Sequence, residues 1–146
     1  MTQFTFSDPN FETRVRANFD RQGMLSTLGA SMDHVCPGEV HLSAPFDSRF
    51  TQQDGFLHAG TVTTLMDSAC GYAAYTLMPA ASRVLSVEFK VNLLTPARGP
   101  RFRAEGRVIK AGRTLTVCEG KLFSIEEEET LCAIMQATMI CMRKES

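Results

Sequence analysis

One stretch of the chain restricts the fold more than any other. Residues 55–75 read GFLHAGTVTTLMDSACGYAAY, and from about residue 58 to 78 almost every side chain is apolar or small, until Pro79 ends the run. A helix that is apolar on all sides is buried in protein. Three threonines, two tyrosines, a serine and an aspartate in the quoted segment make a membrane span costly. We therefore expect a buried central helix at 58–78.

The segments around this helix predict an α+β fold. A short amphipathic helix, two strands and a polar loop are expected before it, at residues 8–22, 25–46 and 47–57. The turn residues Pro37-Gly38 separate the two strands. Four strands are expected after the helix, at residues 84–94, 101–110, 113–125 and 130–142. These elements fit one domain spanning residues 1–146.

The strand at 84–94, VLSVEFKVNLL, alternates between apolar and polar side chains. Its two faces are predicted to carry Leu85, Val87, Phe89, Val91 and Leu93 on one side, and Ser86, Glu88, Lys90 and Asn92 on the other. Four consecutive strands can form an antiparallel meander, which needs an apolar cover on one face. The central helix is the only predicted element long enough to provide it. We therefore predict a curved antiparallel sheet wrapped around one long helix, with an N-terminal helix.

Charge and cysteine content argue against several functions. The formal net charge is -1, whereas binding to nucleic acid needs a concentrated basic surface. The N-terminus lacks the cationic start and apolar core of a secretory signal. Five cysteines, none in a C-x-x-C pair, indicate reduced thiols in a cytoplasmic protein. His34 and His41 are possible metal ligands, but no cysteine or carboxylate spacing supports them, so we predict no metal.

Asp67 is the only charged residue in the quoted segment. A buried carboxylate costs free energy unless it is paired, and no lysine or arginine lies within two helical turns of it in the sequence. Two explanations remain open. Asp67 either pairs across the fold or reaches solvent at a subunit surface, or it is catalytic.

His58-Ala59-Gly60 lies where the polar loop becomes the helix. The first N–H groups of a helix lack internal acceptors and carry the positive end of its dipole. Small side chains let a ligand oxygen approach the backbone, as in an oxyanion hole that polarises a carbonyl. A plain helix start with small residues for packing is the alternative.

The distance between these two features has a consequence for assembly. Asp67 follows His58 by nine residues, which is about 13 Å along a helix and roughly half a turn around it. One carbonyl cannot contact both. If both serve one reaction, the helix start must come from one subunit and the aspartate from another, as in a symmetric dimer with antiparallel central helices.

The segment GFLHAGTVTTLMDSACGYAA resembles the G-x-x-H-G-G-x-x-x-x-x-x-D signature of the hotdog-fold acyl-CoA thioesterases. The resemblance is to the phenylacetic-acid-degradation-type branch of the 4-hydroxybenzoyl-CoA thioesterase superfamily. It extends over roughly residues 20–142 and includes LSVEFKVNLLTPARG and VIKAGRTLTVCEG. It implies a hotdog fold and hydrolysis of an acyl-CoA thioester, with coenzyme A as part of the substrate and no other cofactor. It also implies a homodimer or a tetramer made of two dimers, with no nucleic acid or membrane partner.

The resemblance also implies roles for individual residues. Asp67 matches the catalytic carboxylate, which acts as a general base on water or as a nucleophile. His58, Ala59 and Gly60 match the H-G-G that opens the helix, where a backbone N–H polarises the thioester carbonyl. Alanine replaces the first glycine here, which keeps the N–H but adds a methyl group. Ser86 falls where some members place a hydroxyl that positions water.

The substrate-binding residues are also implied by the resemblance. Gln52 stands where some members carry an asparagine near the thioester, and Arg98, Lys110 and Arg113 lie in turns near the coenzyme. Two other hotdog classes compete: a non-catalytic acyl-CoA or acyl-carrier binder, and a hydroxyacyl-thioester dehydratase. Binding alone gives no reason to bury Asp67, and the loop before His58 lacks the proline of the dehydratase signatures. We therefore favour the thioesterase.

Overall fold

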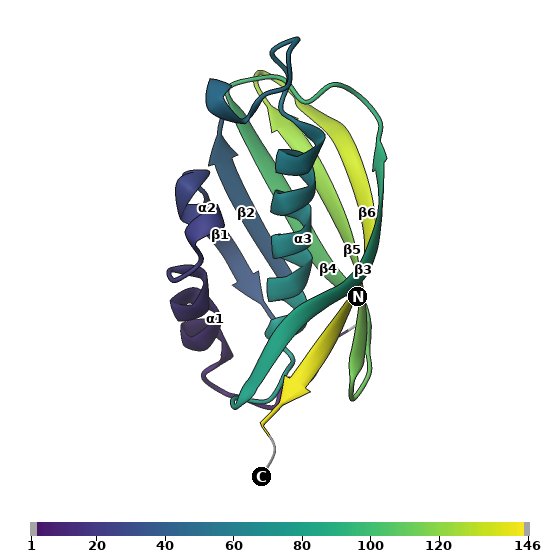
Figure 1. Ribbon diagram of the computed structural model, residues 1–146. Helices are drawn as coiled ribbons and strands as arrows, with labels where there is room; N and C mark the ends of the chain where they lie inside the picture. The colour runs from purple at the N-terminus through teal and green to yellow at the C-terminus, as the bar shows by residue number, and fades with distance from the viewer. Residues whose placement is uncertain (1–2, 145–146) are drawn as a thin grey trace.

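The computed structural model describes residues 3–144 (Figure 1). The helices are α1 (Phe11–Phe19), α2 (Gly23–Thr27), the 3-10 turn η1 (Ser48–Phe50) and α3 (Ala59–Tyr75). The strands are β1 (Ser31–Cys36), β2 (Glu39–Pro45), β3 (Ser82–Leu93), β4 (Arg101–Ala111), β5 (Leu115–Ile125) and β6 (Glu129–Arg143). None of the described helices is long and apolar enough to cross a membrane.

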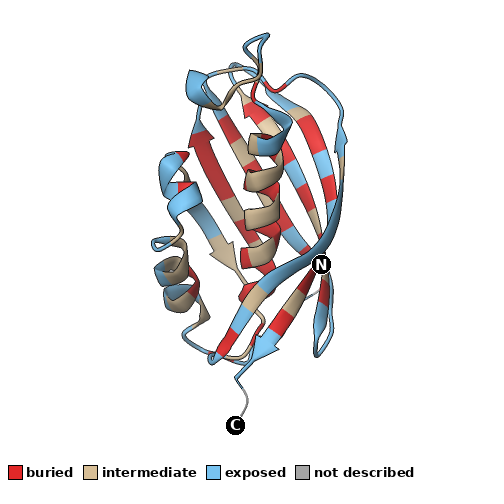
Figure 2. Cartoon of the chain, viewed as in Figure 1, coloured by how far each residue is buried: buried red, intermediate tan, exposed pale blue. Residues whose placement is uncertain are grey.

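The six strands form one antiparallel sheet in the order β1-β2-β4-β5-β6-β3. The sheet curves around α3, and α1 and α2 lie beside it near β1 (Figure 1). Buried residues concentrate on the strand positions behind α3 (Figure 2), and nine residues of α3 are buried as well. The helix backbone crosses β4 so closely that a Cβ at Gly106 would collide with the backbone at Ala69 and Cys70. The predicted curved sheet around one long helix, with an N-terminal helix, is confirmed.

The N-terminal segment differs from its prediction. The helix expected at 8–22 covers Phe11–Phe19, and a second short helix, Gly23–Thr27, occupies the start of the segment predicted as a strand. Leu25 and Leu28 are both buried, which is a helical spacing of three residues. The first strand therefore begins only at Ser31.

The predicted four-strand meander is wrong in one respect. β4, β5 and β6 pair in sequence order, but β3 pairs with β6 and lies at the opposite edge from β1. The connection at 94–100 contains Pro96 and Pro100 and is longer than a tight hairpin loop, so it does not fold β3 back onto β4. The strands expected at 101–110, 113–125 and 130–142 correspond to β4, β5 and β6, which pair in sequence order as expected.

The strict alternation predicted for β3 is also wrong. A β-bulge lies between Ser86 and Glu88, where one strand carries an extra residue. Ser86 pairs with the buried Met139 of β6, and Phe89 pairs with the buried Ala137. Because of the bulge, Ser86 and Phe89 share the face towards α3, although strict alternation places them on opposite faces.

Candidate active site

Asp67 lies in the middle of α3 and is half-buried. The Ser86 hydroxyl on β3 donates a hydrogen bond to Asp67 Oδ1 at 2.6 Å. In the part of the chain that the structure describes, no cationic side chain forms a salt bridge with this carboxylate. Its single hydrogen bond to a hydroxyl therefore leaves most of its acceptor capacity free.

A small cavity of about 170 Å³ opens onto Asp67 and Ser86. Two polar residues of the N-terminal segment, Asn18 of α1 and Gln22 at the N-cap of α2, line it together with Tyr72 of α3. Gln22 Nε2 donates to the Tyr72 hydroxyl at 3.0 Å, and that hydroxyl donates to Asn18 Oδ1 at 3.1 Å. Burial raises the pKa of Tyr72, while the hydrogen bond from Gln22 opposes the shift, so the phenol stays neutral. Sequence reasoning missed Asn18 and Gln22, because only tertiary packing brings them to Asp67.

His58 is the N-cap of α3, and its side chain is exposed. His58 Nδ1 accepts a hydrogen bond from the Gly60 N–H at 2.8 Å. The His58 carbonyl accepts from the N–H groups of Thr61 and Val62, at 2.9 and 3.1 Å. Among the described residues, Ala59 is then the only one of the first four in α3 whose N–H donates to no protein acceptor. Of the three residues at which an oxyanion site was predicted, Ala59 is therefore the one whose amide is free within the described chain.

A second cavity, of about 320 Å³, lies at this helix start. Its lining includes Gln52 and Ala59 and is otherwise largely apolar, with Phe56, Leu57, Val62, Leu93, Leu94, Thr95, Pro96, Ala97 and Cys132. Gln52 Oε1 accepts from the N–H groups of Asp54 and Phe56, at 2.6 and 3.2 Å, which fixes its side chain in the loop. The structure therefore brings Gln52 and Ala59 to one cavity.

The two cavities share no lining residue. Asp67 and Ala59 are eight residues apart on α3, about 12 Å along its axis. Within one protomer the Asp67 carboxylate and the free Ala59 amide therefore lie at different cavities.

The three basic residues predicted near the coenzyme do not lie together. Arg98 lines an opening that shares Thr95 and Pro96 with the cavity at the helix start. Lys110 and Arg113 are exposed around the turn from β4 to β5, at the opposite end of the sheet from the start of α3 (Figure 1). Within one protomer, Arg98 alone of these three is near the Ala59 cavity.

Possible metal ligands do not gather at either cavity. Among the described residues, the group that could hold a metal ion is His34, Cys36 and Glu39, on the hairpin of β1 and β2. These two strands do not contribute to the linings of the Asp67 and Ala59 cavities.

Comparison with known proteins identifies the class. A family model described as thioesterase superfamily matches residues 54–131. A solved structure of a thioesterase family protein from Silicibacter pomeroyi is 48% identical, covers 92% of this chain and 99% of that chain, and superposes with a TM-score of 0.90. The 1,4-dihydroxy-2-naphthoyl-CoA hydrolase of Escherichia coli is 26% identical over 115 residues, which are 79% of this chain and 83% of that protein.

A thioesterase from Staphylococcus aureus adds a comparison with altered residues. Its solved variant, in which a glutamine is replaced by alanine, is 25% identical, covers 83% of this chain and 99% of that chain, and gives a TM-score of 0.78. A second solved variant of that protein has alanine in place of a glutamate fifteen residues further along.

These matches confirm the resemblance seen in the sequence. The chain belongs to the thioesterase superfamily. It has the hotdog fold, and it is a thioester hydrolase.

Proposed function

We propose that this chain hydrolyses acyl-CoA thioesters at two equivalent sites formed across a homodimer. Each site combines the Ala59 amide of one subunit with Asp67 of the other, and the reaction needs no metal or cofactor beyond the substrate's own coenzyme A. The supporting observation is that one protomer holds its free amide and its cation-free carboxylate in separate cavities.

The proposed chemistry follows from these groups. The Ala59 N–H polarises the thioester carbonyl and stabilises the negative charge that develops on its oxygen. Asp67 activates a water as general base or attacks the carbonyl carbon itself, and the coenzyme A thiolate leaves. Ser86, which holds Asp67 Oδ1, positions the attacking water. His58 positions Ala59, since its side chain and carbonyl take the neighbouring amides and leave that one free.

The edge strand β3 supports the dimer. Its apolar side chains are unusually exposed for such a long strand: 56% at Leu85, 54% at Val87, 48% at Phe89 and 56% at Leu93. An exposed, apolar strand edge is a template for pairing with another chain. A second copy pairing antiparallel along β3 would cover both this edge and these side chains.

The positions of the two cavities along β3 support the same assembly. Val84 and Ser86 line the Asp67 cavity, whereas Leu93 lines the Ala59 cavity. An antiparallel β3 pair centred between Val84 and Leu93 sets Leu93 of one chain opposite Val84 of its partner. The Ala59 cavity of each subunit would then adjoin the Asp67 cavity of the other.

The Staphylococcus aureus variants support the assignment of Gln52. The substituted glutamine and glutamate of that protein are fifteen residues apart, which is also the spacing from Gln52 to Asp67. We propose that Gln52 contacts the thioester beside Ala59, as its place in the same cavity allows. Asp67 then corresponds to the glutamate of that protein, and the aspartate side chain is one methylene shorter.

The coenzyme and the cellular setting complete the proposal. The name of the Escherichia coli relative specifies a CoA thioester, and the basic residues Arg98, Lys110 and Arg113 would attract the phosphates of coenzyme A. We place the chain in the phenylacetic-acid-degradation-type branch, as a dimer or a pair of dimers. All five cysteines are free, which suits the reducing cytoplasm.

The proposal is tested by assaying thiol release from a panel of aromatic and aliphatic acyl-CoA thioesters, with enzyme treated with a chelator. We expect hydrolysis of at least one class, unchanged by the chelator. No release from any member, or activity that the chelator removes and Zn²⁺ restores, would contradict it.

A further inference from the structure

Four residues with metal-binding side chains meet on the hairpin of β1 and β2. His34 pairs with His41 across the two strands, and Cys36 pairs with Glu39 beside the turn. The neighbouring Val40 and Leu42 point into the core and are fully buried, so His41 and Glu39 lie on the outer face of the sheet. The sequence prediction found no cysteine or carboxylate spacing to support a metal. Strand pairing provides the proximity that linear spacing does not show.

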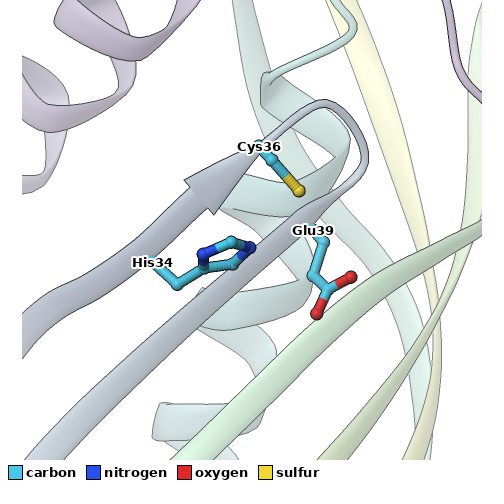
Figure 3. Close-up of side chains that lie close together, drawn as sticks. All are labelled: His34, Cys36 and Glu39. Atoms are coloured by element: carbon cyan, nitrogen blue, oxygen red, sulfur yellow. The ribbon is translucent and has the colours of Figure 1, made fainter.

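Three of these side chains are close enough to share one ion. The ligand atoms of His34, Cys36 and Glu39 all lie within 4.8 Å of one another (Figure 3). A single point therefore lies within about 2.8 Å of all three, and small side-chain rotations would reach the bond lengths of about 2.0–2.3 Å that Zn²⁺ makes to such ligands.

The surroundings orient the Glu39 carboxylate. His41 Nε2 lies 2.6 Å from Glu39 Oε1, and Arg107 Nη2 lies 3.1 Å from the same oxygen. A ligating carboxylate is commonly held in this way by hydrogen-bonding neighbours. Arg107 also forms an ion pair with Glu105 Oε2 at 3.8 Å, so it keeps a charged partner if Glu39 turns towards an ion.

The backbone of the hairpin is fixed independently of these side chains. The Gly38 N–H donates to Thr76 Oγ1, and the Gly38 carbonyl accepts from the Val108 N–H, both at 2.8 Å. Gly38 has a φ of +81°, which favours glycine in the turn. Cys36 and Glu39 flank this anchored turn, so most of the ligand geometry is built before any ion binds.

We propose that His34, Cys36 and Glu39 bind one Zn²⁺ ion, with water in the fourth position and His41 positioning Glu39. Imidazole, thiolate and carboxylate are all ligands that Zn²⁺ accepts in tetrahedral sites. The ion would tie the edge strand β1 to β2 on the face of the sheet opposite α3. It stabilises the fold and takes no part in thioester hydrolysis.

Titration of the reduced, metal-free protein with Co²⁺ tests the site. We expect one equivalent to bind, with the visible bands of tetrahedral cobalt and a near-ultraviolet thiolate-to-cobalt band, and Zn²⁺ to displace it. Cys36→Ser should remove the thiolate band, and His34→Ala should weaken binding at least about tenfold. His41→Ala should weaken binding about 10–100-fold, the usual range for a supporting residue. Cys141→Ser, a buried cysteine outside the cluster, is the matched control and should leave the spectrum unchanged.

Several results would overturn the proposal. These are no stoichiometric Co²⁺ binding, a thiolate band that survives Cys36→Ser, or a band that disappears only in Cys141→Ser. The thermal midpoint gives a second readout, since Zn²⁺ should raise it in the unmodified chain and not in Cys36→Ser. Thioesterase activity of Cys36→Ser should equal that of the unmodified chain, so failure here is separable from failure of the proposed function.

Discussion

The two ends of α3 differ in how completely other parts of the chain provide hydrogen-bond partners for their backbone groups. At the C-terminal end, Arg14 donates to the carbonyls of Tyr75 and Met78, at 3.2 and 2.9 Å, and stacks 4.2 Å from the Tyr75 ring. Asp8 holds Arg14 by a salt bridge of 2.8 Å. The buried Thr76 hydroxyl donates to the Ala73 carbonyl at 2.7 Å. A distant side chain, Arg14, thus binds the last carbonyl of the helix and the Met78 carbonyl just beyond it, while the C-cap residue Thr76 takes the Ala73 carbonyl.

The N-terminal end has no such external cap. His58, Ala59 and Gly60 are exposed, and the helix is capped by the side chain of His58, the residue just before it. The Ala59 amide points to no protein acceptor in the described chain, beside a largely apolar cavity. A helix end with an external cap supports the fold, whereas an end with a spare donor is available to a substrate. Under the proposed function, the C-terminal end of α3 therefore serves stability and the N-terminal end serves the chemistry.

Replacing Asp67 should give the largest effect and affect only activity. Asp67→Asn should lower kcat at least about a hundredfold, the scale on which a general base or nucleophile acts. Its thermal midpoint should change little, because its recorded partner is a single hydroxyl. Steady-state thiol release and thermal unfolding measure both, with the exposed Asp20→Asn as control. An active Asp67→Asn enzyme would remove the carboxylate from the mechanism.

Removing the Ala59 N–H at the N-terminal end of α3 should give the second-largest effect. Proline is well tolerated at the first position of a helix, and His58 already has the extended backbone that precedes proline (φ -59°, ψ 141°). Ala59→Pro should therefore fold and lose about a hundredfold in kcat, as when an oxyanion donor is removed. Ala59→Gly keeps the N–H and should stay within a few-fold of the original rate. Equal kinetics for the two variants would refute the role of this amide.

A change at the C-terminal end of α3 should lower stability and leave activity nearly unchanged. Arg14→Ala leaves two carbonyls and Asp8 without their charged partner, so it should lower the free energy of unfolding by about 2–3 kcal/mol. Below the new thermal midpoint, kcat should remain within a few-fold of the unmodified chain. Urea unfolding measures the stability loss. A variant that is as stable as the unmodified chain but inactive would contradict this division of roles between the two ends of α3.

The smallest effect should be a pH dependence of stability that arises from Asp8, which holds Arg14 at the C-terminal end of α3. The Asn10 N–H and the Arg14 guanidinium lower the pKa of Asp8 from its ordinary value of 3.8. Its contribution to stability is therefore present above about pH 4 and is lost as the pH falls through the lowered value. Asp8→Asn should be less stable at pH 7 and should lose less stability between pH 7 and about pH 3. An acid limb identical to that of the unmodified chain would contradict this.

The parts of the fold that depend on local pattern were predictable. The apolar run predicted the central helix to within three residues at its end. The strands after it were placed nearly correctly, and burial alternates clearly along β4, β5 and most of β6. The helix Gly23–Thr27 was missed, since five residues are too few to establish a period. The place of β3 beside β6 and its bulge depend on long-range pairing, which no local pattern encodes.

The candidate site also contains residues that the sequence pattern predicted and residues that only the tertiary structure reveals. Asp67 stands out in the sequence as the lone charge in an apolar helix, and the helix start stands out because a histidine and two small residues open the apolar run. The contact of Ser86 with Asp67 required the bulge, which turned a predicted outer-face serine inward. The polar residues Asn18 and Gln22 reach the Asp67 cavity only through the packing of the N-terminal helices. Their involvement could not be read from spacing.

The most direct test of the shared site mixes two inactive subunits. Asp67→Asn and Ala59→Pro chains, separately tagged and refolded together, should give mixed dimers isolated by both tags. Each mixed dimer has one site with both Asp67 and the Ala59 amide intact and one site with neither. The account predicts about half the kcat of the unmodified dimer, against about a hundredfold loss in either parent. Purified mixed dimers that remain as inactive as the parents would contradict a site formed between two subunits.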